Sequence, residues 1–168
     1  GVAATSNADA ALSLELPWVS SVQITFSLVE QTARDELPLD QFLGKAILAR
    51  NPRGFGTLTD LGRDLTAEDY TWDDEEADRL RSMAQAFRFL AGPKRSLATA
   101  AIKYVLQQPG ITVALPRATS PEDLNDILAA SEARELTAEE MSRIDDTWRA
   151  SCMGLRKYGY RSGAAVSP

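Results

Sequence analysis

The chain has 168 residues, of which 44% are hydrophobic and 25% are charged, a composition typical of one globular domain with a substantial core. Its net charge of −6 argues against a nucleic-acid partner, and the absence of histidine excludes Ser-His-Asp triads, Cys-His dyads and nearly all zinc sites. Because there is one cysteine, no signal-peptide layout and no apolar run near the ~18 residues of a membrane span, we expect a cytoplasmic protein with no membrane partner.

The first third of the chain alternates β-rich segments with helical ones. The expected strands cover residues 2–5, 21–26 and 46–49, and the expected helices cover 8–16 and 33–43. Pro38 suggests that the second helix begins late or bends, and Gly44 ends it. A long connection that contains glycine and aspartate follows over 51–73.

The rest of the chain continues this alternation. A helix is expected over 74–91, and another over 96–108 with Ser96 as its N-cap. A buried strand is expected over 111–115. Ser120 and Pro121 begin a helix whose apolar stripe is Leu124, Ile127 and Leu128, and the T-x-x-E box at 137–140 begins the last helix.

Short strands that alternate with helices predict an α/β fold with about four parallel strands, right-handed crossovers, flanking helices and one extra C-terminal helix. We expect one domain over residues 1–153 and a tail over 154–168, because the small residues and tyrosines after 154 do not resemble a core element.

Longer motifs within this pattern resemble the aldo-keto reductase family. Residues 96–110 (SLATAAIKYVLQQPG), 119–124 (TSPEDL) and 136–145 (LTAEEMSRID) resemble its last helices and strand, and 19–26 (VSSVQITF) and 46–56 (AILARNPRGFG) resemble two earlier strands. The resemblance covers roughly 1–146. It implies half of a (β/α)₈ TIM-type barrel, with strands five to eight, because a whole barrel takes about 250 residues.

The resemblance also implies which chemistry is missing. Aldo-keto reductases use a tyrosine as general acid, assisted by lysine, aspartate and usually histidine, and all four lie on the first four βα units. This chain lacks those units, and we expect its tyrosines, at positions 70, 104, 158 and 160, to be packing or tail residues. The chain alone is therefore not expected to reduce a ketone.

The corresponding half of the family mostly binds NADPH, so the resemblance assigns cofactor contacts. Gln23 matches the glutamine that holds the nicotinamide carboxamide, whereas the partner Ser-Asn pair falls on Ala3-Ala4, with Ser6-Asn7 as an alternative alignment. Arg50 stands where the family has a stacking aromatic residue. The full set of candidate contacts is Gln23, Arg50, Asn51, Arg53, Gly56, Arg117, Thr119 and Asp126.

The phosphate-binding part of this set is altered. Residues 51–56 (NPRGFG), with Arg53 and Gly56, replace the family's pyrophosphate loop, and they suit either a cofactor loop or a plain glycine turn. Arg117 matches a basic residue for the 2′-phosphate, and Thr119 opens a helix N-terminus suited to an anion. Asp123, however, replaces a basic or neutral residue and repels such a phosphate. Ile127 replaces an adenine-binding asparagine, which leaves Asp126 to meet the adenine.

Two hypotheses follow. The chain is either the cofactor-binding half of an NADPH-dependent carbonyl oxidoreductase, or a non-catalytic half-barrel that acts as an interaction or small-molecule-binding module. Both a natural short protein and a truncated fragment fit the sequence. Half a barrel leaves open strand edges, so we expect a homodimer or a complementary half-barrel chain as partner.

Overall fold

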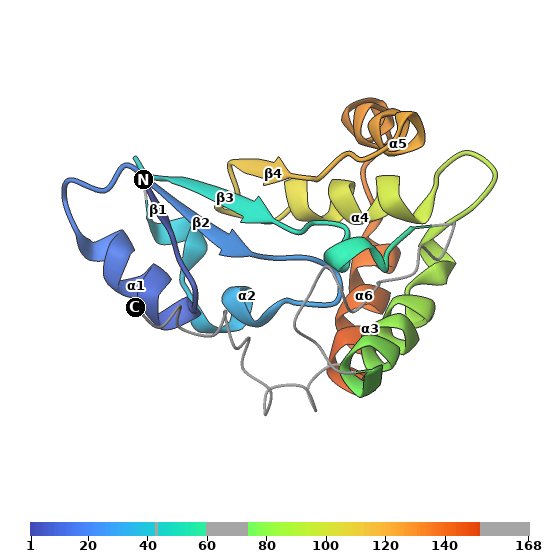
Figure 1. The fold of residues 1–168 in the computed structure, drawn as a ribbon, viewed down its shortest axis with the longest axis horizontal. Helices are drawn as coiled ribbons and strands as arrows, with labels where there is room; N and C mark the ends of the chain where they lie inside the picture. Colours follow the sequence, from blue (N-terminus) through green and yellow to red (C-terminus); the bar gives the residue numbers. More distant parts are fainter. Residues whose placement is uncertain (43, 60–73, 152–168) are drawn as a thin grey trace.

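A computed structural model describes residues 1–42, 44–59 and 74–151. Within these residues, the strands β1 (Val2–Ala3), β2 (Ser21–Thr25), β3 (Ala46–Arg50) and β4 (Val113–Leu115) form one parallel sheet in the order β1-β2-β3-β4 (Figure 1). The predicted four-stranded parallel sheet is confirmed. The predicted tail over 154–168 lies outside the described residues.

The helices flank this sheet and alternate with its strands. They are α1 (Asn7–Glu15), α2 (Thr32–Glu36), α3 (Asp74–Ala86), α4 (Leu97–Leu106), α5 (Pro121–Glu132) and α6 (Ala138–Ser151), with 3₁₀ turns η1 (Leu39–Gln41), η2 (Gly54–Gly56) and η3 (Arg88–Leu90). The predicted serine caps of α4 and α5 are confirmed, because Ser96 accepts from Thr99 N and Ser120 accepts from Asp123 N.

The capping box of α6 is confirmed as well. The amide of Glu140 donates to Thr137 Oγ1 at 3.2 Å, and the amide of Thr137 donates to Glu140 Oε2 at 2.8 Å. These two bonds satisfy amide groups that have no partner within the helix, so α6 begins where the local sequence places it.

Several predicted elements are shorter than expected: β1 covers 2–3 rather than 2–5, and the helix expected over 74–91 is divided into α3 and η3. The helix expected over 33–43 is split into α2 and η1 at Pro38, because proline has no amide to donate and its ring obstructs a continuing helix. The strand expected over 111–115 begins only at Val113, which is 40% exposed rather than buried. β4 is incompletely buried because it is the last strand of the sheet and has a neighbour on one side only.

The sheet has one covered face and one less covered face. Val22, Ile24, Ile47 and Ala49 point to the helices and are fully or almost fully buried. The alternate residues of the same strands, which include Gln23, are only half-buried. We call this second side of the sheet the inner face, because it is the side that turns inward when such a sheet closes into a barrel.

The remaining core lies between the sheet and the helices. Phe26 and Tyr104 stack there with ring centroids 6.0 Å apart and an interplanar angle of 12°. Tyr104 donates to Gln31 Oε1 at 2.7 Å, and both residues are completely buried. No helix in the described part of the chain combines the length and hydropathy that crossing a membrane requires.

Candidate functional site

The candidate site lies at the carboxyl ends of the four strands. The strands are parallel, so β1 to β4 end at the same edge of the sheet, after Ala3, Thr25, Arg50 and Leu115. Ligand sites in parallel α/β folds lie at this edge, because the loops that follow the strands are free to vary there without disturbing the core.

Arg50 spans three of these strand ends. It is the last residue of β3, and its Nε donates to Thr25 Oγ1 of β2 at 2.9 Å. Its Nη2 donates to the carbonyl oxygen of Ala4, directly after β1, at 2.6 Å. The guanidinium group therefore connects β1, β2 and β3 across their carboxyl ends, at the position where the resemblance places an aromatic residue.

Gln23 lies beside this arginine on the inner face. It is in register with Ala3 on one side and Leu48 on the other, and Leu48 is in register with Val113. Its side chain lies on the same face as that of Arg50, because alternate residues along β2 and β3 point to the same side. Gln23 is half-buried and lies in the middle of β2, so it is partly open on the inner face.

A second cluster surrounds Asp123 at the start of α5. Arg53 Nη1 donates to Asp123 Oδ1 at 2.6 Å, and Arg53 Nη2 donates to the carbonyl oxygen of Arg117. The amide and the hydroxyl of Thr119 each donate to Asp123 Oδ2 at 2.8 Å. Arg53 is 8% exposed and Asp123 is 4% exposed, so this ion pair is buried.

Charge and hydrogen bonding keep the Asp123 carboxylate ionised. The hydrogen bond from Arg53 holds the pKa of Asp123 well below its ordinary value; burial alone would raise it, and the bonds from Thr119 lower it further. The sequence indicated Asp123 only as a repulsive charge and did not reveal its pairing with Arg53. The one indication of that pairing in the sequence was an acidic residue at a position where the resemblance places a basic or neutral one. Arg53 is 70 residues away from it.

The loop after β3 makes its own turns. Asn51, Gly54, Phe55 and Gly56 have positive φ angles of 56°, 55°, 59° and 94°. Within it, the amides of Gly54 and Gly56 donate to the carbonyl oxygens of Asn51 and Arg53. Amides that bond within the loop are not presented to a phosphate, which favours the interpretation of residues 51–56 as a glycine turn that positions Arg53.

The candidate cofactor residues thus form two groups with one outlier. Gln23, in the middle of β2, and Arg50, at the end of β3, share the inner face, and Arg53 contacts the segment that holds Arg117 and Thr119 just before α5. Asp126 instead accepts from Ser96 Oγ at 2.6 Å and so ties α5 to the N-cap of α4. Asn51 and Gly56 shape the loop between β3 and Arg53.

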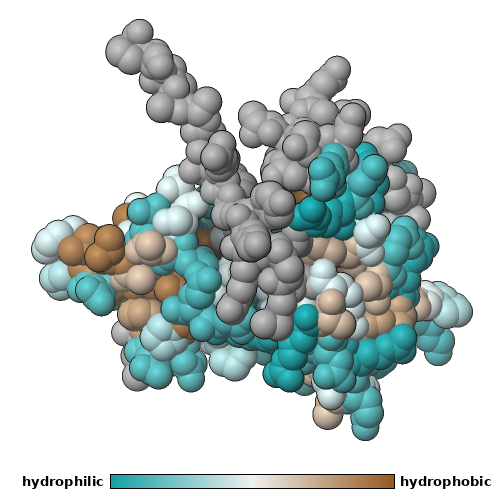
Figure 2. Space-filling model, turned by 90° about the horizontal axis from the view of Figure 1, so that it is seen from below, coloured by the Kyte–Doolittle hydropathy of each residue, from teal (hydrophilic) through white to brown (hydrophobic). Residues whose placement is uncertain are grey.

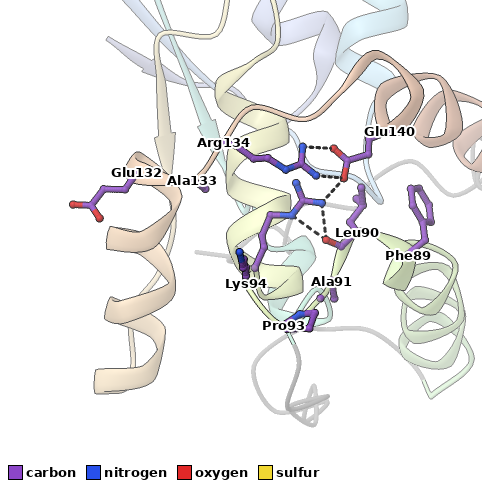
Figure 3. A pocket seen from close by; sticks show the side chains of 11 residues that line it. Phe89, Leu90, Ala91, Pro93, Lys94, Glu132, Ala133, Arg134 and Glu140 are labelled. Atoms are coloured by element: carbon purple, nitrogen blue, oxygen red, sulfur yellow. Dashed lines mark hydrogen bonds and ion pairs between the residues drawn. The ribbon is translucent and has the colours of Figure 1, made fainter.

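A pocket of about 730 Å³ lies elsewhere, between η3, the start of α4 and the connection from α5 to α6 (Figure 3). Three of its charged groups bind one another: Glu140 accepts from Arg95 at 2.6 Å and from Arg134 at 2.9 Å. The ion pair of Arg95 with Glu140 connects α6 to the turn before α4. Nowhere in residues 1–42, 44–59 and 74–151 are three or more His, Cys, Asp or Glu side chains grouped to hold a metal ion.

Comparisons with known proteins agree with this architecture. Residues 3–149 match the model of the aldo/keto reductase family. The chain is 25% identical over 128 residues to an uncharacterized oxidoreductase of Bacillus subtilis (strain 168), a match that covers 75% of this chain and 42% of the relative.

Solved structures show the same fold. An aldo-keto reductase of Bacillus halodurans in its holo form is 22% identical, with a TM-score of 0.65 and coverage of 88% of this chain and 49% of that one. The glycerol dehydrogenase of Gluconobacter oxydans is also 22% identical, with a TM-score of 0.65 and coverage of 100% and 52%. The chain therefore spans about half the length of these proteins, and its fold is half of a (β/α)₈ barrel, as predicted.

Proposed function

Because the chain belongs to the aldo/keto reductase family, we propose that it is the cofactor-binding half of an NADPH-dependent carbonyl oxidoreductase. The observation that carries this proposal is the place of Gln23 on the inner face of the sheet, with Arg50 at the end of β3 and with Arg53 and Arg117 in the segments that follow β3 and β4. A side-chain amide on the inner face suits a ligand with an amide end, and the carboxyl edge of a parallel sheet is where such folds bind ligands.

The proposal assigns binding, not proton transfer, to these residues. When bound, the nicotinamide cofactor supplies a hydride to a carbonyl carbon, and the oxygen then needs a proton donor. Tyr104, the one tyrosine among the described residues, is fully buried and already donates to Gln31; the other three, Tyr70, Tyr158 and Tyr160, lie outside them. We therefore propose that the first four βα units of the barrel provide the general acid.

The residues present fit a nicotinamide dinucleotide only in part. At the nicotinamide end, the amide of Gln23 can pair with a carboxamide, but the charge of Arg50 disfavours the oxidised, positively charged ring. At the phosphate end they do not fit, because the negative charge of Asp123 sits among the donors. We therefore expect weak binding of NADPH to this chain.

The proposal also requires the other half of the barrel. One row of residues in register crosses the inner face from β1 to β4: Ala3, Gln23, Leu48 and Val113. Each of them is half-buried or exposed. Exposed apolar side chains also lie in and after the helices that follow β1 and β4 along the chain. They are Leu12, Leu16 and Trp18 in and after α1, and Leu124 and Leu128 on α5, with exposures of 65%, 37%, 77%, 49% and 58%.

Figure 2 shows hydrophobic surface on the side of the molecule where Figure 1 places α1. Open strand edges and apolar side chains of this size are liabilities in water. We propose that both are covered by a complementary (β/α)₄ half-barrel that supplies the remaining strands, because the related barrels are about twice as long as this chain.

An intact-mass measurement together with sedimentation, on the protein isolated from its source, tests the partner. We expect either one chain well above 18.3 kDa or a second chain that co-purifies and contains the missing βα units. A monodisperse monomer of 18.3 kDa contradicts the proposal. A particle of twice that mass contradicts a complementary half-barrel and indicates that a second copy of this chain covers these surfaces.

A titration of the 168-residue chain with NADPH, followed by cofactor fluorescence and calorimetric heat, tests the cofactor. We expect weak, saturable binding that Gln23→Leu removes and Gln41→Leu leaves unchanged, since Gln41 is exposed in η1, before β3 begins. The absence of binding in every variant contradicts the proposal. It would then favour the second candidate, a non-catalytic interaction module, which the internal engagement of Arg50 and Arg53 already supports.

A further inference from the structure

The Asp123 carboxylate occupies a place built for an anion. Three donors from two different segments converge on its two oxygens: Nη1 of Arg53, and the amide and hydroxyl of Thr119. The carboxylate also lies in the first turn of α5, a 12-residue helix whose N-terminus favours negative charge. A charged guanidinium and a helix N-terminus are the groups with which proteins bind phosphate oxygens.

We propose that Asp123 is a built-in anion that fills this oxyanion site and excludes a phosphate from it. The identity of the excluded phosphate rests on the proposed function, according to which it is the 2′-phosphate of NADPH. Arg53 and Asp123 together carry no net charge, so a phosphate placed beside them meets a neutralised cation and a carboxylate. An external oxyanion binds only when the carboxylate is removed and its donors are released.

A purely structural ion pair makes a different prediction. Removing Asp123 would then leave Arg53 buried without its partner and lower the stability of the fold, and added phosphate would not restore it. If Asp123 instead stands in for a phosphate, inorganic phosphate should take its place and recover the lost stability, since a ligand that binds only the folded state stabilises it.

The first experiment measures the melting temperature of the full chain against inorganic phosphate at constant ionic strength. The variants are Asp123→Ser and the matched control Glu140→Gln, whose carboxylate also binds two arginines but lies by the separate pocket of Figure 3. We expect Asp123→Ser to melt below wild type and to recover saturably with phosphate, with a phosphate Kd at least tenfold lower than that of wild type or Glu140→Gln. Equal responses in all three proteins overturn the inference.

Asp123→Asn keeps the test decisive if Asp123→Ser does not fold. Asparagine has the shape of aspartate and retains an oxygen that accepts from Arg53 or Thr119, so the fold should persist. Without the negative charge, phosphate should again bind more tightly than to wild type. A phosphate Kd equal to that of wild type overturns the inference.

A second titration separates this inference from the proposed function. NADPH and NADH share their pyrophosphate and differ in the 2′-phosphate, so Asp123→Ser should tighten NADPH binding at least tenfold and NADH binding much less. Phosphate binding to Asp123→Ser without binding of either dinucleotide supports the built-in anion and contradicts the proposed function. Tighter NADPH binding by wild type than by Asp123→Ser supports the function and overturns the inference.

Discussion

Removing the hydroxyl of Tyr104 tests the polar network in the core and the role of this tyrosine at once. In Tyr104→Phe the ring stays stacked on Phe26 at 6.0 Å, so no cavity forms. Gln31 Oε1, fully buried, loses the donor that lies 2.7 Å away. Arg34 Nη1 loses a long contact of 3.3 Å but keeps its ion pair with Asp145 at 2.7 Å.

The expected cost is that of one buried acceptor left unpaired, about 1–3 kcal/mol. Most domains are stable by only about 5–15 kcal/mol, so this loss is readily measured. At about 2–4 °C per kcal/mol for a domain near this size, the melting temperature should fall by roughly 2–12 °C. Urea unfolding gives the same quantity as a lower midpoint at unchanged slope.

The same variant should leave NADPH binding unchanged, because Tyr104 is fully buried in α4 and its hydroxyl is already bonded to Gln31. The reasoning fails if the unfolding free energy changes by less than about 0.5 kcal/mol, a value typical of surface substitutions. It also fails if cofactor binding is lost while stability is retained, since Tyr104 would then act at the ligand.

Three further predictions follow from local geometry. Gly110 has φ +82° and a Cβ there would lie 2.3 Å from the carbonyl oxygen of Leu39, so Gly110→Ala should lower the melting temperature, whereas Gly92→Ala, with nothing within 4 Å, should not. Burial opposes ionisation of Glu140, but hydrogen bonds from two arginines prevail and lower its pKa from 4.5 to about 2. The contribution of this carboxylate to stability is therefore complete above pH ~4.5 and lost as the pH falls toward 2. Over that pH range, the unfolding free energy of Glu140→Gln should decline less than that of wild type. Leu124→Lys should leave the melting temperature of this chain unchanged, because that side chain is exposed, yet it should weaken association with a complementary half-barrel in sedimentation.

Local signals in the sequence predicted most of the fold. Ser96, Ser120 and the pair Thr137–Glu140 each place a helix start through bonds that span three residues, so the chain itself carries the whole interaction. The alternation of strands and helices then determined the parallel sheet. Pro38 correctly predicted a break in the second helix. The form of that break, a short helix followed by a separate 3₁₀ turn, depends on packing around it.

The site was harder to predict because its contacts join distant segments. Arg53 and Asp123 are 70 residues apart, and nothing near either one in sequence indicates that they pair. Arg50 likewise bonds to residues 25 and 46 positions away. A resemblance can align such positions with a family's ligand contacts. It does not reveal that a substituted side chain has turned to bind its own protein.

Two of the three tryptophans differ in exposure and give the chain an internal optical reporter, while Trp72 lies outside the described residues. Trp18 is 77% exposed in the connection that follows α1, whereas Trp148 is 3% exposed and fixed within α6. Indole emission shifts to shorter wavelength when water leaves the ring, so a partner that covers the α1 side should move the signal of Trp18. The emission of Trp148 would stay constant as a reference. Closure of the barrel can thus be followed in solution without any added label.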